Sequence, residues 1–162
     1  MEKVITGSCL CGVVTYRVEA APLVVGDCYC LDCRKSSGTA YCTHAGVPDA
    51  ALALTGTLST YTSAADSGNS VRRAFCPSCG SAILSTNSGM PGMTFIRVSS
   101  MADPDLAPPQ MTVYAKRAPA WARIDRDKPV YEGMATDVAA QASELLTNTP
   151  AVPDGSPPAK TR

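Results

Sequence analysis

Seven of the eight cysteines in this 162-residue chain lie in three tight clusters. These clusters are Cys9-Leu10-Cys11, Cys28-Tyr29-Cys30-Leu31-Asp32-Cys33 and Cys76-Pro77-Ser78-Cys79, and Cys42 stands alone. Disulfides do not favour this arrangement, because cysteines so close in sequence would close strained rings. The same spacing places thiolates on one side of a tight turn, where Zn–S bonds of about 2.3 Å can converge on one ion. The chain is therefore expected to fold around bound zinc.

Two of the three clusters end in Cys-Gly, at Gly12 and Gly80. Glycine lets the chain curl so that backbone N–H groups point at the sulfurs, which supports a thiolate site. These two turns supply one complete tetrahedral set, which consists of Cys9, Cys11, Cys76 and Cys79. The remaining Cys28, Cys30 and Cys33 have no obvious fourth protein ligand, and three protein ligands are typical of a catalytic zinc. We therefore expect two zinc ions per chain, one structural and one catalytic.

The residues alone leave three alternatives for the second set. Either Cys42 or His44, the only histidine, could complete it, which would make both zinc sites structural. A single zinc with the other cysteines free is the third alternative. We favour a small buried thiol for Cys42 and a polar strand residue for His44.

Between its glycines and prolines, the chain mostly alternates apolar and polar residues, which is typical of short strands. In residues 14–19, for example, Val14, Tyr16 and Val18 fall on one face. Similar strands are expected near residues 40–46, 51–55, 57–62, 70–76, 81–86, 93–99 and 111–116, the last with Met111 and Val113 opposite Thr112 and Tyr114. A shorter helical turn is expected after Cys30. The predicted fold class is therefore mainly β.

The chain divides into three predicted segments. Residues 1–135 form the zinc-binding β domain, and residues 136–147 form a helix that Thr136 or Asp137 could cap. Residues 148–162 carry four prolines among small polar residues. We expect this tail to be disordered, because it cannot bury enough apolar surface to offset its ordering entropy.

Charge and hydropathy exclude two classes of function. Lys and Arg number 14 against 14 Asp and Glu, which argues against a surface that neutralises phosphates, so no nucleic acid partner is expected. No stretch approaches the roughly 20 apolar residues of a membrane span, and the first residues lack the apolar core of a signal peptide. We therefore expect a cytoplasmic protein without a membrane partner, of an oligomeric state that the sequence does not predict.

Three stretches around the cysteines carry a family resemblance. They are Gly7-Ser8-Cys9-Leu10-Cys11-Gly12-Val13-Val14-Thr15-Tyr16, Cys28-Tyr29-Cys30-Leu31-Asp32-Cys33-Arg34-Lys35-Ser36-Ser37-Gly38 and Arg73-Ala74-Phe75-Cys76-Pro77-Ser78-Cys79-Gly80-Ser81. In combination they resemble the glutathione-dependent formaldehyde-activating enzyme family, which includes centromere protein V. A weaker match at Pro119-Ala120-Trp121 and Pro129-Val130-Tyr131 extends the resemblance over roughly residues 3–134.

The resemblance implies a β-tent (Mss4-like) fold of short antiparallel sheets held by zinc. It also implies a structural zinc at Cys9, Cys11, Cys76 and Cys79 and a second zinc at the catalytic residues Cys28, Cys30 and Cys33, in agreement with the spacing. Tyr29 departs from the family, whose members often carry histidine between the first two cysteines of the triple. A residue between two ligands normally points away from the metal, so this difference bears on the substrate contact.

The expected chemistry joins or splits a thiol and an aldehyde. A zinc held by three thiolates is a weak Lewis acid, but it suits a soft thiol, and metal coordination removes the thiol proton. Attack of the thiolate on a small aldehyde gives a hemithioacetal, and the reverse step breaks a carbon–sulfur bond. The resemblance implies glutathione and formaldehyde as reactants, as in an S-(hydroxymethyl)glutathione synthase. We expect a zinc-dependent carbon–sulfur lyase or glutathione adduct-forming enzyme, with other thiol conjugates also as substrates.

Several other residues carry predictions. Glutathione is anionic, and Arg34 and Lys35, which directly follow Cys33, are the predicted substrate-binding residues. We expect Trp121 in the core rather than in a pocket wall, and Asp32 on the surface. The main alternative to an enzyme is a non-catalytic binding or scaffold protein stabilised by zinc. A third possibility is a redox switch that releases zinc when the triple is oxidised.

Overall fold

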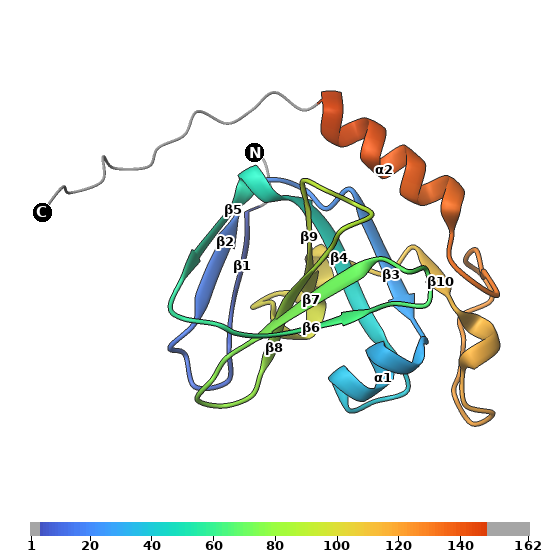
Figure 1. The fold of residues 1–162 in the computed structure, drawn as a ribbon, viewed down its shortest axis with the longest axis horizontal. Helices are drawn as coiled ribbons and strands as arrows, with labels where there is room; N and C mark the ends of the chain where they lie inside the picture. Colours follow the sequence, from blue (N-terminus) through green and yellow to red (C-terminus); the bar gives the residue numbers. More distant parts are fainter. Residues whose placement is uncertain (1–3, 149–162) are drawn as a thin grey trace, which may run out of the picture.

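The computed structural model describes residues 4–148, and its strands form two sheets (Figure 1). The smaller sheet is antiparallel, with the order β1 (Ile5–Ser8), β2 (Thr15–Val18), β5 (Leu52–Thr55). The larger sheet has the order β10 (Met111–Val113), β3 (Val24–Cys28), β4 (Cys42–Pro48), β9 (Met93–Arg97), β8 (Ala82–Asn87), β7 (Ser70–Phe75), β6 (Ser59–Ala64). β10 pairs with β3 in parallel, and the other neighbours pair antiparallel. The mainly β, tent-like class expected from the sequence is confirmed.

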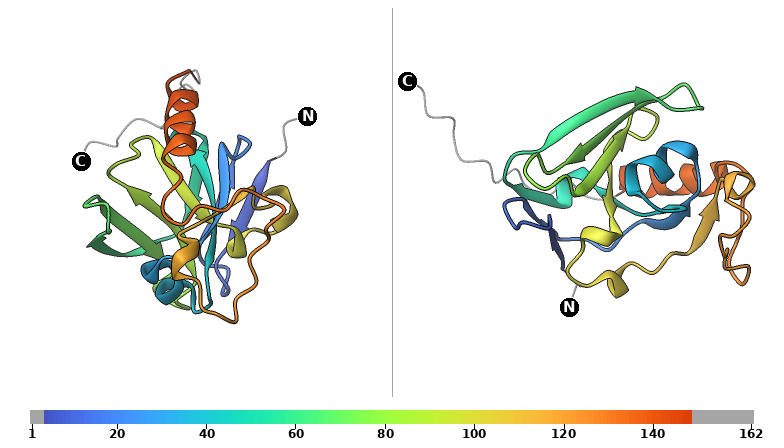
Figure 2. Two further views of the ribbon diagram at one scale, coloured as in Figure 1. Left: turned by 90° about the vertical axis from the view of Figure 1, so that its right-hand side faces the viewer. Right: turned by 90° about the horizontal axis from the view of Figure 1, so that it is seen from below.

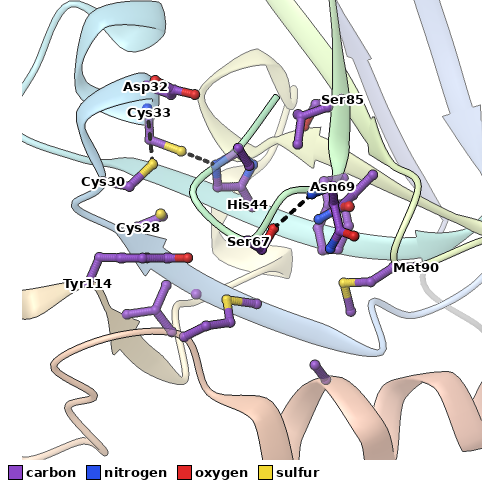
Figure 3. Close-up of a pocket in the computed structure, with 18 of the residues that line it drawn as sticks. Cys28, Cys30, Asp32, Cys33, His44, Ser67, Asn69, Ser85, Met90 and Tyr114 are labelled. Carbon is purple, nitrogen blue, oxygen red and sulfur yellow. Dashed lines mark hydrogen bonds between the residues drawn. The ribbon is translucent and has the colours of Figure 1, made fainter. Parts of the chain in front are cut away.

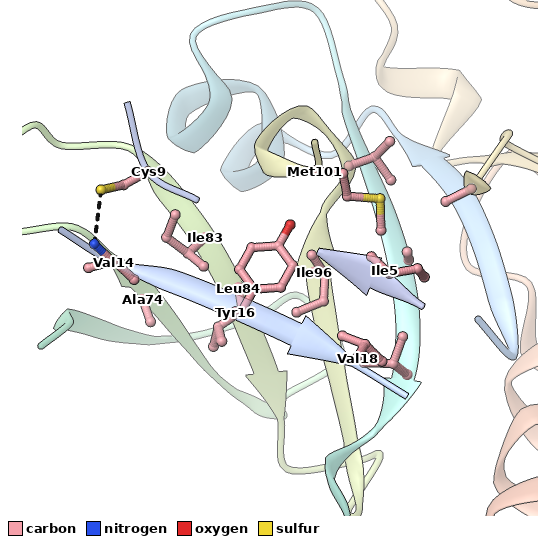
Figure 4. Close-up of a cluster of buried hydrophobic side chains, with 14 of the residues drawn as sticks. Ile5, Cys9, Val14, Tyr16, Val18, Ala74, Ile83, Leu84, Ile96 and Met101 are labelled. Carbon is pink, nitrogen blue, oxygen red and sulfur yellow. Dashed lines mark hydrogen bonds between the residues drawn. The ribbon is translucent and has the colours of Figure 1, made fainter. Parts of the chain in front are cut away.

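The main core lies between the two sheets. Val14, Tyr16 and Val18 are all buried, as the alternation predicts, and they face side chains of the larger sheet (Figure 4). Ile83, Leu84 and Ile96 from β8 and β9 are among those partners. The Tyr16 hydroxyl hydrogen-bonds Ser100 Oγ at 2.9 Å, so this phenol is not left unpaired in the core.

Most predicted strands are found within two residues of the expected ends. Two strands were not predicted, β1 and β3. Both contain a glycine, Gly7 in β1 and Gly26 in β3, which interrupts the alternation that the sequence prediction relies on.

The last predicted strand, 111–116, is shorter than expected. Tyr114 has a φ of 57°, and the 3-10 turn η4 (Ala115–Arg117) follows it, so β10 ends at residue 113. Thr112, which was expected on the face opposite Met111 and Val113, is nevertheless buried. Thr112 is 3% exposed because the segment near Pro129 covers this edge, and the Thr112 N–H donates to the Pro129 carbonyl at 2.9 Å.

The expected helices are both present. α1 (Leu31–Ser37) follows Cys30, and α2 (Thr136–Asn148) covers the predicted C-terminal helix. Ala139, Ala142 and Leu146 of α2 pack with Met90 and Met93, which places α2 beside the larger sheet (Figure 2). Three further 3-10 turns are η1 (Asp49–Ala51), η2 (Val98–Ser100) and η3 (Pro104–Leu106).

The predicted disordered tail, 148–162, lies outside the described residues except for residue 148, which ends α2. Within residues 4–148, no helix has both the length and the apolar character that crossing a bilayer requires.

Candidate metal centres and the adjoining cavity

The first cysteine group lies on two turns of similar design, one from each sheet. Cys9 follows β1 and Cys76 follows β7. In the first turn the Gly12 N–H donates to the Cys9 carbonyl at 3.1 Å, and in the second the Gly80 N–H donates to the Cys76 carbonyl at 2.9 Å. The φ values of Gly12 and Gly80 are 78° and 74°, in the left-handed region that glycine adopts without strain. The two glycines therefore form the tight turns that the Cys-Gly pattern predicts.

The sulfurs of this group fit a tetrahedral ion. The four Sγ atoms of Cys9, Cys11, Cys76 and Cys79 all lie within 4.8 Å of one another. The Cys9 and Cys11 sulfurs are 3.5 Å apart, and those of Cys11 and Cys76 are 3.8 Å apart. Tetrahedral Zn–S bonds of about 2.3 Å place their sulfurs roughly 3.8 Å from one another. The group can therefore hold a metal ion, and that ion would tie the two sheets together.

Hydrogen bonds from the turns support these sulfurs as thiolates. The Val14 N–H donates to Cys9 Sγ at 3.3 Å (Figure 4). Cys79 Sγ lies 3.2 Å from Ser81 Oγ. Hydrogen bonds from the Ser81 side chain and then from its backbone N–H lower the pKa of Cys79 to about 5. A thiolate at this position is the form that binds zinc.

The second group is built where a strand meets a helix. Cys28 is the last residue of β3, Cys30 is the N-cap of α1, and Cys33 lies in the first turn of α1. The Cys33 N–H donates to Cys30 Sγ at 3.3 Å, and the three Sγ atoms lie within 4.8 Å of one another. Hydrogen bonds from the thiols of Cys28 and Cys33, and from the backbone N–H of Cys33, lower the pKa of Cys30. This group can also hold a metal ion.

A cavity of about 300 Å³ adjoins the second group (Figure 3). Figure 3 shows the three sulfurs on one side of it and Asn69 and Met90 across from them. β-strands of the larger sheet, the α1 turn and α2 all contribute to its lining. The four cysteines of the first group are not among the lining residues. The second group therefore faces a space that a small molecule can fill, and the first group does not line this cavity.

His44 lies beside the second group without joining it. Its Nε2 is 3.3 Å from Cys33 Sγ, but the cluster of ligand atoms within 4.8 Å consists of the three sulfurs alone. Burial, and then the positive charge of Arg97, lower the pKa of His44 to about 3, so its ring is neutral. Arg97 Nη1 lies 2.9 Å from the same Nε2, so this nitrogen is already engaged. This geometry favours His44 as a neighbour of the site over His44 as a fourth ligand.

Cys42 is buried, as expected for a small apolar thiol, but it also has a specific partner. Arg97 Nη1 donates to Cys42 Sγ at 2.7 Å. Burial raises the pKa of Cys42, which opposes its becoming a metal-binding thiolate. Cys42 is absent from the three-sulfur cluster as well.

Arg97 is a buried charge whose surroundings fit an anionic metal centre. It is 2% exposed, its Nε has no hydrogen-bond partner, and no carboxylate within residues 4–148 forms an ion pair with it. A buried guanidinium is costly unless an anion lies nearby. A divalent zinc with three thiolates has a net charge of minus one, so the loaded second group would supply that anion. The residues present therefore fit a zinc ion at this group.

The comparison with family models identifies the chain. The model described as glutathione-dependent formaldehyde-activating enzyme matches residues 4–117. The chain belongs to this family. Curated proteins give no match. Among solved structures, a crystal structure of a Rhodobacter sphaeroides protein is 18% identical, with a TM-score of 0.49, over 78% of this chain and 98% of that one.

Tyr114 stands out in this member of the formaldehyde-activating family. It is the one non-glycine residue with a positive φ among the described residues, and its N–H donates to the Gly133 carbonyl at 2.8 Å. Figure 3 shows its hydroxyl in the cavity, near the sulfurs of Cys28 and Cys30. Burial, and then the charges of these two cysteines, raise the pKa of Tyr114, so the phenol keeps its proton at neutral pH. Backbone strain of this kind is often found at functional sites.

The cations that line the cavity differ from those that sequence proximity indicated. Arg34 and Lys35 lie on α1 but are not among the lining residues. Arg73, Arg97 and Arg117 line the cavity instead. Arg73 comes from β7, far from the second group in sequence, and Arg117 comes from the η4 turn.

Two of these arginines are held by acidic partners at the cavity. Arg73 pairs with Asp32 at 2.9 Å, and Arg117 pairs with Asp66. Asp32, expected on the surface, is half-buried and lines the cavity. The expectation that Trp121 belongs to the core is wrong, because its side chain is 76% exposed.

Sequence reasoning did not find Arg97 or Tyr114. Each lies in a segment that has the pattern of an ordinary short strand. Arg97 is the last residue of the mostly apolar strand β9, and this position is only a weak indication that its charge is buried at a functional site. Tyr114 offers no such signal, because the positive φ depends on the η4 turn and on the segment near Gly133.

Proposed function

We propose that this protein is a zinc-dependent carbon–sulfur lyase that forms or cleaves the adduct of a thiol, such as glutathione, with an aldehyde. The observation that carries the proposal is the group of Cys28, Cys30 and Cys33, whose sulfurs converge beside a cavity of about 300 Å³. The family match supports glutathione and formaldehyde as the starting substrates to test. The proposal includes two zinc ions per chain, a zinc-binding domain over residues 1–135 and action in the cytoplasm, where thiols stay reduced.

In this proposal Cys28, Cys30 and Cys33 would hold a zinc ion, which would lower the pKa of a bound substrate thiol so that its sulfur is nucleophilic at neutral pH. The chain's own residues handle the proton. Tyr114 holds a hydroxyl proton in the same cavity. As sulfur bonds to the carbonyl carbon, the electron pair of the C=O π bond moves to oxygen, which takes the Tyr114 proton. In the reverse direction the phenolate takes that proton back while the carbon–sulfur bond breaks.

Charged groups at the cavity suit the carboxylates of glutathione. Arg73 and Arg117 line the cavity and bring fixed guanidinium groups to it, since each is held by an acidic partner. The role of Arg34 and Lys35 in substrate binding stays a prediction. Because both lie on α1 and neither lines the cavity, they would act on the substrate through their positive charge from outside the cavity.

A single substitution tests the proposal. Cys30→Ser removes the N-cap sulfur from the second group and leaves the first group intact. We expect this variant to bind one zinc fewer per chain and to lose at least about 100-fold in the rate of adduct formation, because activation of the thiol depends on the metal. The rate is measured by exchange NMR with glutathione and formaldehyde, relative to the uncatalysed reaction. Full activity in Cys30→Ser would show that the catalytic assignment is wrong.

Cys42→Ser is the matched control, because it makes the same chemical change at a buried cysteine outside the three-sulfur cluster. This variant should keep both zinc ions and most of the turnover, since serine oxygen can also accept from Arg97. Loss of the second zinc in Cys42→Ser, or four protein sulfurs at both ions by X-ray absorption, would instead support a non-catalytic zinc-stabilised scaffold.

A further inference from the structure

The cavity beside the second group is longer than a one-carbon substrate requires. Val24, Gly26 and Cys28 all line it, and they are alternate residues on one face of β3. The four steps along the strand from Val24 to Cys28 span about 13 Å, at roughly 3.3 Å per residue. The cavity therefore runs along β3 from the cysteine sulfurs to the other end of the strand.

Gly26 lies in the middle of this path, with the Met111 side chain from β10 against it. A Cβ built at Gly26 would lie 3.3 Å from Met111 Cγ. Any larger residue would therefore narrow the passage between Cys28 and Val24.

The far end of the cavity is apolar. Beyond Gly26 the lining comes from Val24, Phe95 and Met90 of the sheet and its loops, and from Val138 and Ala139 of α2. Asp32, His44 and Tyr114 lie toward the cysteines, and Asn69 lies across from them beside Met90 (Figure 3), so the apolar part of the lining is the part formed by β3 and α2. Methionine side chains adapt to the shape of an apolar guest, so this end suits flexible chains as well as rigid ones.

We propose that the substrates of this site are adducts of aldehydes that carry an apolar chain of several carbons, with the sulfur at the cysteines and the chain along β3 toward α2. This inference rests on the proposed function for the identity of the reaction, but not for the apolar path itself. The balanced step is the same for any such aldehyde. The S–H bond breaks and its proton passes to water, the C–S bond forms, the C=O π pair moves to oxygen, and this oxygen takes the Tyr114 proton, which water then restores to the phenolate. No oxidant or reductant takes part.

The test compares aldehydes of similar intrinsic reactivity and increasing length. With zinc-loaded full-length protein and glutathione, kcat/KM should rise about threefold to fourfold per added methylene from propanal through butanal to hexanal, as each buried CH₂ contributes. A kcat/KM that stays flat or falls over this series would overturn the inference, even if all three aldehydes turn over.

Ala139→Phe fills the far end of the cavity and should remove most of the dependence on chain length. Ala140→Phe makes the same change at an exposed position of α2 and should keep the dependence of the unmodified protein. A full chain-length dependence in Ala139→Phe would show that the chain does not lie along this path.

A binding measurement separates the two proposals. S-hexylglutathione should bind to the zinc-loaded protein roughly 30- to 60-fold more tightly than S-propylglutathione by calorimetry, for three more buried methylenes. If this preference is found but no aldehyde is turned over, the apolar path stands and the lyase proposal fails. If turnover is found while the two conjugates bind equally, the lyase proposal stands and the apolar path is wrong.

Discussion

Both cysteine groups offer thiolate sulfurs to a metal, but the two groups differ in their number of sulfurs and in what surrounds them. Cys9, Cys11, Cys76 and Cys79 come from two matching turns on two sheets, and the group supplies four sulfurs. Cys28, Cys30 and Cys33 come from one strand end and one helix start, supply three sulfurs and adjoin a cavity. A complete set that joins two sheets suits a role in stability, whereas an incomplete set beside a cavity suits contact with a substrate. The predictions below test this division.

The largest effect is expected from loss of the four-sulfur group. Cys76 is fully buried, and Cys76→Ser should lower the free energy of unfolding by more than about 5 kcal/mol, because zinc binding at structural sites contributes roughly 10 to 16 kcal/mol. Circular dichroism during thermal unfolding, with zinc content measured alongside, gives the readout. The exposed Ser78 of the same turn provides a control, Ser78→Ala, which should unfold like the unmodified protein. A Cys76→Ser variant that unfolds within a few degrees of it would contradict the structural role.

Metal removal should separate the two groups. A chelator titration should take the first zinc from the three-sulfur group, which has fewer protein ligands, and turnover should fall to the uncatalysed rate while secondary structure persists. The protein should unfold only when the second zinc, that of the four-sulfur group, is removed. Zinc release and circular dichroism are followed on the same sample, and simultaneous loss of both ions with unfolding would break the distinction between the groups.

Removing the cavity phenol should affect chemistry and not stability. Tyr114→Phe keeps the ring and the strained backbone but removes the proton, so kcat should fall about 100-fold with unchanged zinc content and melting temperature. Tyr131→Phe is the control, because Tyr131 packs against the same buried cluster as Tyr114 but does not line the cavity, and this variant should keep its kcat. Equal rates in Tyr114→Phe and the unmodified protein would remove Tyr114 from the mechanism.

A smaller effect is expected when the buried guanidinium is removed. Arg97→Met should weaken zinc at the three-sulfur group by roughly 10- to 100-fold, since a positive neighbour of the anionic centre is lost. The four-sulfur group should keep its affinity. Competition with a chromogenic chelator measures both sites, and Arg72→Met, an exposed arginine of β7, serves as the control. Unchanged affinity at both sites would show that Arg97 does not balance the charge of the metal centre.

The smallest effect belongs to the turns themselves. Gly80→Ala places a side chain at a φ of 74° and should cost about 1 to 2 kcal/mol in the free energy of unfolding, although the added Cβ meets open space. Gly38→Ala, at a φ of 71° where α1 ends, should have a similar cost but leave the four-sulfur group unchanged. Denaturant unfolding at saturating and limiting zinc compares the two. Only Gly80→Ala should become more destabilising as zinc is limited.

The grouping of the cysteines and the fold class could be predicted from the sequence because both depend on local patterns. Cysteine spacing and the two Cys-Gly turns indicated the two groups, and alternation indicated most of the strands. These features need no knowledge of which strands are neighbours.

The surroundings of the second group could not be predicted, because they depend on strand pairing. His44 and Arg97 meet only through the register of β4 and β9, and Arg73 reaches Asp32 from β7. Arg34 and Lys35 adjoin the group in sequence, but the helix carries them away from the cavity lining. For residues around this site, nearness along the chain was therefore a poor guide to nearness in space.

The long separation within the four-sulfur group affects how the protein is made. Cys11 and Cys76 are 65 residues apart, whereas the three-sulfur group occupies six consecutive residues. A nascent chain that has just passed residue 33 already carries every cysteine of the smaller group, but only half of the larger one. We expect the three-sulfur group to assemble early, soon after Cys33 leaves the ribosome. The four-sulfur group, which joins the two sheets, is complete only after Cys79 has emerged.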